Sequence, residues 1–222
     1  MSQPTPLKAI LFDHDGTLIN SEAVHFALWQ QVLRPFQVEL TEQYYNDVMA
    51  GIPVPQNAID AVRDFTLPIS AEELAESKQL LTKEHLMKGP FPLMPGADDT
   101  LKRCKDKGLR LAIVTGGSRL SVMRTMECYG YEDIIECVVA VEDVERSKPA
   151  PDCYLKALNE MGLSASEAMA VEDTEHGLKA AVAAGLRCVA IPTAQSETHD
   201  LSAASAQYSN LSDWVRAEID CL

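Results

Sequence analysis

The feature that most constrains the fold of this chain is an alternation of short apolar runs with amphipathic segments. In the second half of the chain, residues 109–114, 135–141, 168–171 and 187–191 have the length and composition of buried strands. Helical spacing of apolar residues separates these runs, which predicts helices over residues 118–129, 152–161, 175–184 and 211–219. Such alternation predicts an α/β fold with a doubly wound parallel sheet. A further apolar run at residues 8–12 adds a strand near the start of the chain.

Residues 20–88 interrupt the alternation, because their apolar positions follow helical spacing and no strand-like pattern occurs among them. The first predicted helix covers residues 22–34. Thr41 is placed to cap a second helix over residues 42–50. A capping box at residues 70–73 marks the start of another helix.

Glycine and proline are dense in residues 89–96, so the helical insert is expected to end there. We therefore expect two domains. Residues 1–19 and 90–222 form a Rossmann-like α/β catalytic core, and residues 20–89 form a small all-helical cap domain inserted after the first strand.

Composition excludes several classes of partner. The chain has 222 residues, with 33 acidic and 19 basic side chains and a net charge of −14. Nucleic acids and anionic membranes are bound by clustered lysine and arginine, so neither is expected as a partner. The length is enough for one core domain with an insert.

We expect a cytoplasmic location with reduced thiols. No secretory signal pattern occurs near the first residue, and no apolar run is long enough to cross a membrane. None of the six cysteines forms a C-x-x-C pair, and most lie in apolar periodic segments, which argues against a zinc site.

Polar residues follow four of the predicted strands, in residues 13–17, 115–118, 147–149 and 172–174. The carboxyl ends of parallel strands meet at one edge of a sheet, and ligands bind there in doubly wound folds. The four segments are therefore expected to surround one cleft.

The chemistry of these segments suits a phosphate ester and a hard cation. Crowded carboxylates repel one another unless a cation neutralises them, and oxygen ligands favour Mg²⁺. One carboxylate can act as a nucleophile and a second, two residues on, as a general acid and base. Thr115 and the backbone amides of Gly116 and Gly117, at a helix start, can cradle phosphate oxygens. Lys148 supplies a positive charge for the phosphoryl group.

The four segments together resemble the motifs of the haloacid dehalogenase-like hydrolase superfamily, and specifically its capped phosphatases and β-phosphoglucomutase-like members. The matching stretches are residues 12–18, 114–118, 148–152 and 171–177, the last continued by residues 180–185. The resemblance covers nearly the whole chain and implies an enzyme that forms an aspartyl phosphate and uses Mg²⁺.

The resemblance also implies a role for each carboxylate. Asp13 would take the phosphoryl group and bind Mg²⁺ through its other oxygen, and Asp15 would be the acid and base, with its backbone carbonyl on the metal. Asp173 would bind the metal directly or through water, with Glu172 as a helper. Dehalogenases lack an acid at the second position, so Asp15 favours phosphate-ester chemistry.

The resemblance also implies that Thr115 and Lys148 would hold the phosphoryl oxygens.

Two histidines need separate interpretation. His14 stands where the family usually has an apolar or aromatic residue, and a packed side chain is the expectation there. His25 lies where β-phosphoglucomutase-like members have a histidine, and it is equally a substrate contact, reaching Asp15 when the cap closes, or an ordinary helix residue.

We therefore predict a Mg²⁺-dependent phosphatase for a small phosphomonoester, such as a sugar phosphate, acting as a monomer or weak dimer. A phosphosugar mutase is the alternative, although residues 51–56 lack the arginine by which mutases grip a second phosphate. Arg63 is a possible substitute for it. A non-catalytic sensor of a phosphate ligand is the alternative of another class, and the Asp13–Asp15 pair argues against it.

Overall fold

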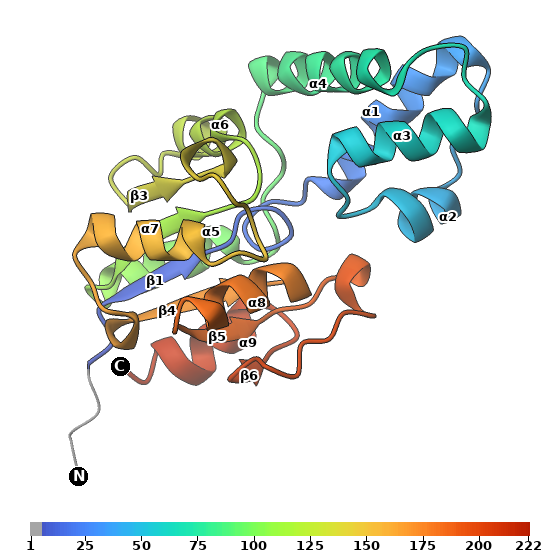
Figure 1. Ribbon diagram of the computed structural model, residues 1–222. Coiled ribbons are helices and arrows are strands. Elements are labelled where there is room, and N and C mark those ends of the chain that lie inside the picture. Colours follow the sequence, from blue (N-terminus) through green and yellow to red (C-terminus); the bar gives the residue numbers. More distant parts are fainter. Residues whose placement is uncertain (1–5) are drawn as a thin grey trace. The chain divides into compact units, whose positions relative to one another are not determined.

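The computed structural model describes residues 6–222, and it contains one parallel sheet (Figure 1). Six strands stand in the order β3-β2-β1-β4-β5-β6, and every neighbouring pair is parallel. Their bounds are β1 Ala9–Phe12, β2 Arg110–Val114, β3 Ile135–Val139, β4 Ala168–Glu172, β5 Arg187–Ala190 and β6 Ala206–Gln207. The doubly wound α/β fold predicted from the sequence is confirmed. Because β1 lies between β2 and β4, the chain direction across the sheet reverses beside β1, where such folds bind ligands.

Alternate residues of β1 pack on opposite faces of the sheet, as the period-two geometry of a strand requires. Ala9 and Leu11 belong to one apolar core with residues of α7 (Asp152–Met161) and α8 (Glu175–Ala183). Ile10 and Phe12 belong to the other, with residues of α5 (Ala97–Asp106), α6 (Arg119–Tyr129) and α9 (Leu211–Trp214). All four β1 side chains are fully buried, which explains why the strand is apolar throughout.

One predicted strand is shorter than expected, and one predicted helix keeps its bounds but is not α-helical throughout. The strand expected over residues 135–141 stops at Val139, and a short 3₁₀ helix, η3 (Val141–Asp143), follows. The last helix is α9 continued by a π-helical segment, η6 (Val215–Ile219). Further 3₁₀ turns occur at η4 (Ala165–Glu167) and η5 (Ala194–Ser196).

The chain divides into two compact units, Met1–Asn20 with Pro92–Leu222, and Ser21–Phe91. The smaller unit contains α1 (Glu22–Leu33), η1 (Arg34–Phe36), α2 (Glu42–Tyr44), η2 (Tyr45–Met49), α3 (Val54–Phe65) and α4 (Ala71–Lys88). It has a core of its own, which includes Trp29, Leu33 and Leu74. The role of this unit as a cap stays a prediction.

The capping residues predicted for the helical unit are confirmed. The Thr41 side chain accepts a hydrogen bond from the Tyr44 amide, and Ser70 and Glu73 form a reciprocal capping box. The helix expected over residues 42–50 is only one α-helical turn, and it continues as the π-helix η2.

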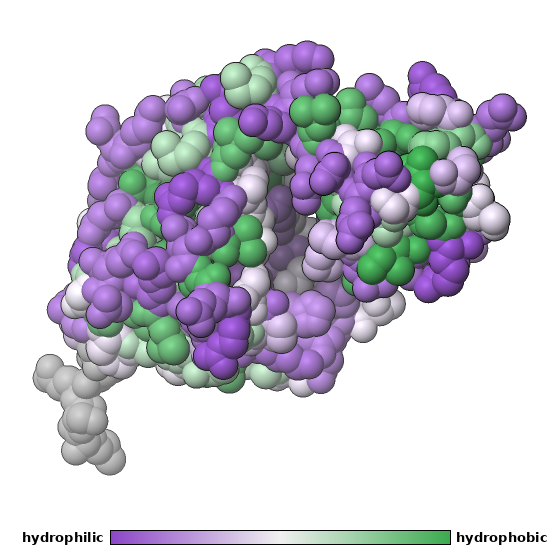
Figure 2. Space-filling model, turned by 45° about the horizontal axis from the view of Figure 1, so that its top comes forward, coloured by the Kyte–Doolittle hydropathy of each residue, from purple (hydrophilic) through white to green (hydrophobic). Residues whose placement is uncertain are grey.

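The surface of the helical unit carries hydrophobic residues, drawn in green in Figure 2. Its exposed large apolar side chains are Ile52, Ile59, Leu80 and Met87. In the described part of the chain, no helix combines the length and the apolar character needed to cross a bilayer. All six cysteines are free thiols, and four of them are buried.

Candidate active site

Three carboxylates lie together at the carboxyl ends of β1 and β4. Asp13 directly follows β1, Glu172 ends β4 and Asp173 follows it, and an oxygen of each lies within 4.8 Å of an oxygen of the others. The Asp13 amide donates to the carbonyl of Val171 at 2.9 Å, so the ladder between the two strands continues to the site. The expected convergence of these strand ends is what the structure shows.

Lys148 lies beside these carboxylates, and its ammonium group has three hydrogen-bond acceptors. Its Nζ donates to Asp13 Oδ1 at 2.6 Å, to Glu172 Oε1 at 2.7 Å and to the Val114 carbonyl at 2.9 Å. The side chain is only 8% exposed. Burial opposes its charge, but Asp13 and Glu172 outweigh burial and raise the pKa of Lys148.

The three carboxylates outnumber the lysine, and their remaining oxygens lack donors. Asp13 Oδ2, Glu172 Oε2 and Asp173 Oδ1 are buried without a hydrogen-bond partner. Burial raises the pKa of Asp13, and burial with the charge of Asp13 raises that of Asp173. Burial also raises the pKa of Glu172 to about 7 against the opposing effect of Lys148. Such a group of buried, undersatisfied carboxylates is typical of a functional site.

Glycines make room for these carboxylates. A Cβ on Gly177 would lie 1.9 Å from Glu172 Oε2, and one on Gly16 would lie 2.2 Å from Asp173 Oδ2. Gly16 also has φ +84°, which disfavours other residues. Neither glycine is among the predicted site residues, because their importance appears only when the fold brings these carboxylates against them.

Asp15 differs from the buried carboxylates in being accessible. Its side chain is 34% exposed, and its Oδ2 lies 3.4 Å from Thr115 Oγ1, which donates to it. The Gly117 amide donates to Thr115 Oγ1 at 2.8 Å. A phosphate held by Gly117, as the sequence predicts, would therefore share or replace this bond. Two contacts stay predictions: the bond from the Gly116 amide to a phosphate oxygen, and the bond from the Asp15 carbonyl to the metal.

His14 is a packed side chain, fully buried, as expected. Its Nε2 lies 3.1 Å from Thr125 Oγ1, and Thr125 in turn donates to the Ser121 carbonyl at 3.1 Å. The Thr125 hydroxyl hydrogen is thus used, so Nε2 carries the proton. The other ring nitrogen, Nδ1, lies 3.7 Å from Asp15 Oδ2.

His25 belongs to the helical unit, where it contacts a buried lysine that the sequence does not single out. Lys78 Nζ lies 3.0 Å from His25 Nδ1, donates to Thr82 Oγ1 at 2.9 Å and lies 5.6 Å from the Trp29 ring centre. Burial lowers the pKa of Lys78 to about 8, although Glu22 opposes the shift. A substrate contact by His25 stays a prediction.

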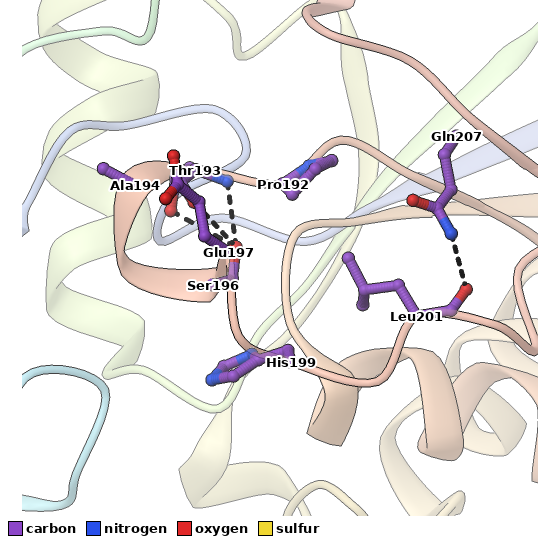
Figure 3. Close-up of a pocket in the computed structure, with 8 residues that line it drawn as sticks. All are labelled: Pro192, Thr193, Ala194, Ser196, Glu197, His199, Leu201 and Gln207. Atoms are coloured by element: carbon purple, nitrogen blue, oxygen red, sulfur yellow. Dashed lines mark hydrogen bonds between the residues drawn. The ribbon is translucent and has the colours of Figure 1, made fainter.

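A separate cavity of about 330 Å³ opens beyond β5 (Figure 3). None of the predicted site residues lines it. Its walls are Pro192, Thr193, Ala194, Ser196, Glu197, His199, Leu201 and Gln207. In Figure 3 the Gln207 amide donates to the Leu201 carbonyl, at 3.0 Å.

Comparison with known proteins gives consistent results. A family model described as haloacid dehalogenase-like hydrolase matches residues 10–191. Protein CbbY of Rhodobacter capsulatus is 31% identical over 214 residues, which are 93% of this chain and 94% of that protein. Validoxylamine A 7'-phosphate phosphatase of Streptomyces hygroscopicus subsp. limoneus is 29% identical over 202 residues, 88% of this chain and 89% of that one.

A solved structure extends the likeness to the fold. CbbY from Rhodobacter sphaeroides, crystallised in complex with phosphate, has a TM-score of 0.81 at 26% identity, covering 96% of this chain and 99% of that chain. The family match spans every segment that supplies the carboxylates and the lysine. The chain therefore belongs to the haloacid dehalogenase-like hydrolases.

Proposed function

We propose that the chain is a Mg²⁺-dependent phosphatase that hydrolyses a small phosphomonoester, such as a sugar phosphate, through an aspartyl phosphate. The observation that carries the proposal is the buried group of Asp13, Glu172 and Asp173 around Lys148, with the accessible Asp15 beside it. Two relatives support a phosphate ester as the substrate, since one is named validoxylamine A 7'-phosphate phosphatase and the other was crystallised with phosphate.

The donor set fits a divalent cation. When all three carboxylates are ionised, they and the one ammonium carry a charge of −2, since −3 + 1 = −2, and each carboxylate has an oxygen with no hydrogen-bond partner. Oxygen-only donors suit Mg²⁺. When bound by Asp13, Asp173, Glu172 and the Asp15 carbonyl, the ion would neutralise the charge of the phosphate dianion.

The chain's own residues would carry both steps of the reaction. Asp13 attacks phosphorus, and the bond from phosphorus to the leaving oxygen breaks as Asp15 gives that oxygen a proton. Asp15, now ionised, takes a proton from water, and the water oxygen attacks the phosphorus of the aspartyl phosphate. The bond from phosphorus to the Asp13 oxygen breaks, which restores the Asp13 carboxylate and releases inorganic phosphate. Lys148 and Thr115 hold the phosphoryl oxygens during both steps.

The helical unit offers no observation that favours the mutase. Arg63, the possible substitute for the missing arginine, already pairs with two carboxylates of its own helix, at 2.8 Å from Asp60 and 2.7 Å from Asp64. We therefore favour a phosphatase over a phosphosugar mutase.

A substrate panel tests the proposal. We expect the purified protein to release inorganic phosphate from an aryl phosphate and from several sugar phosphates, and to lose this activity with EDTA. A coupled assay for conversion of hexose 1-phosphate to hexose 6-phosphate should stay negative. Isomerisation would support the mutase instead, and binding without turnover would support the sensor.

The raised pKa values predict how pH affects the response to Mg²⁺. In the metal-free protein Glu172 keeps a proton up to about pH 7, above its ordinary pKa of 4.5, so its contribution to stability is lost as pH rises between these values. Mg²⁺ needs the ionised form and replaces the proton. The rise in melting temperature on adding Mg²⁺ should therefore be larger at pH 8 than at pH 6, measured by scanning fluorimetry. An equal or larger rise at pH 6 would contradict this assignment.

A further inference from the structure

Tyr154 contacts two of the predicted site residues at once. It lies on α7, which begins four residues after Lys148, and its side chain is fully buried. Its hydroxyl donates to Glu172 Oε1 at 2.6 Å, and its ring centre lies 5.2 Å from Lys148 Nζ. A carboxylate oxygen can only accept from a hydroxyl, so the single hydrogen of the Tyr154 hydroxyl is committed to Glu172.

The two oxygens of Glu172 have different surroundings. Oε1 accepts hydrogen bonds from both Tyr154 and Lys148, whereas Oε2 is buried with no donor. The carboxylate lies against Gly177, where a Cβ would overlap it. Two donors on one oxygen therefore fix which oxygen remains for another partner.

Lys148 cannot secure this arrangement alone. Its three N–H groups are shared among Asp13, Glu172 and the Val114 carbonyl, and the proposed reaction requires it to contact phosphoryl oxygens as well. Any bond that it gives up for the phosphate weakens its hold on a carboxylate. The Tyr154 hydroxyl donates its one hydrogen to Glu172, and the proposed reaction gives Tyr154 no contact with the phosphate. Its bond to Glu172 therefore does not compete with the phosphate.

We propose that Tyr154 is a positioning residue for the divalent cation, holding Glu172 Oε1 so that Oε2 stays available to the ion or to its bound water. The proposal rests on the proposed function, since it needs the cation at Asp13, Glu172 and Asp173. Groups that orient a metal ligand typically change metal affinity by about 10- to 100-fold when removed.

The test is the Mg²⁺ affinity of Tyr154→Phe, which keeps the ring against Lys148 and removes only the hydroxyl. Calorimetric titration of the full-length protein with MgCl₂, without phosphate, should show a dissociation constant raised by about 10-fold or more. Tyr131→Phe is the matched control, because Tyr131 is also buried and donates to a carboxylate, Asp98, at 3.0 Å, outside the cluster. Its Mg²⁺ affinity should equal that of the wild type.

Kinetics and a double-mutant cycle separate positioning from loss of packing. Tyr154→Phe should need more Mg²⁺ for half-maximal rate and approach the wild-type kcat at saturating Mg²⁺. Its effect on affinity should shrink in a Glu172→Gln background, because Tyr154 acts through Glu172. Unchanged affinity in Tyr154→Phe, or an equal effect in both backgrounds, overturns the inference. A wild-type protein that binds no Mg²⁺ would instead refute the metal dependence of the proposed function.

Discussion

Replacing Asp13 by asparagine should abolish phosphate release, with a loss in kcat on the order of 10⁴-fold or more, as expected when a covalent nucleophile is removed. An amide oxygen is a poor nucleophile and cannot form the aspartyl phosphate. The fold should survive, because the carboxylate of Asp13 is buried with one oxygen unpartnered, and burial raises its pKa. A neutral side chain of the same shape removes that cost, so the melting temperature without Mg²⁺ should not fall.

Asp15→Asn and Asp106→Asn complete the experiment. Asp15→Asn should lose about 10²- to 10⁴-fold, the usual contribution of general acid–base catalysis. It should also accumulate phosphoprotein with an aryl phosphate whose leaving group needs no proton, which intact-protein mass spectrometry would detect. Asp106 is exposed on α5, so its asparagine variant should behave as the wild type. Turnover by Asp13→Asn at a rate near that of the wild type would exclude Asp13 as the nucleophile.

The parts of the fold that the sequence predicts are those in which local pattern and burial agree. β1 is apolar along its whole length, and β4 is apolar up to its last residue, Glu172, because both faces of each strand are covered. β6 is not predicted, since two residues, Ala206 and Gln207, are too few to show a period. α5 is not predicted either, although Ala97, Leu101 and Cys104 are spaced as a buried helical stripe. The glycines and prolines of residues 89–96 predict a loop, and the helix begins directly after them.

The candidate site divides in the same way. Asp13, Glu172 and Asp173 are predicted because they stand at the ends of apolar runs, and parallel strands bring their carboxyl ends together. Tyr154 and Gly177 lie inside helices. From the sequence alone, a tyrosine in a helix indicates a core residue, and a glycine indicates a position where the helix is less stable. Only the packing of α7 and α8 against the sheet places both against Glu172. From the sequence, Lys78 is likewise expected to be a solvated lysine on a helix. In the structure it is buried, because α4 packs on α1.

Lys148→Met should have the largest effect on stability. Among the described residues, Lys148 is the cation that pairs with the buried Asp13 and Glu172, and methionine would leave both carboxylates without it. Removing one partner of a buried ion pair typically costs about 3–5 kcal/mol. Urea denaturation without Mg²⁺ should show a loss of that size in the free energy of unfolding. Phosphatase activity should fall by about 10²-fold or more, because the charge that we propose to hold the phosphoryl group is gone.

The pH dependence of this loss separates charge from packing. Without Lys148 the pKa values of Asp13 and Glu172 rise further, so protonation relieves the buried charge at low pH. The destabilisation should therefore be larger at pH 8 than near pH 5.5, and saturating Mg²⁺ should reduce it at pH 8 by supplying the missing positive charge. Lys156→Met is the control, because the half-exposed Lys156 on α7 forms a surface pair with Glu160 at 3.1 Å, and such pairs contribute about 0–1 kcal/mol. A loss in Lys148→Met that is the same at both pH values and unaffected by Mg²⁺ would mean that Lys148 contributes packing alone, and that the carboxylates do not repel one another in the folded protein.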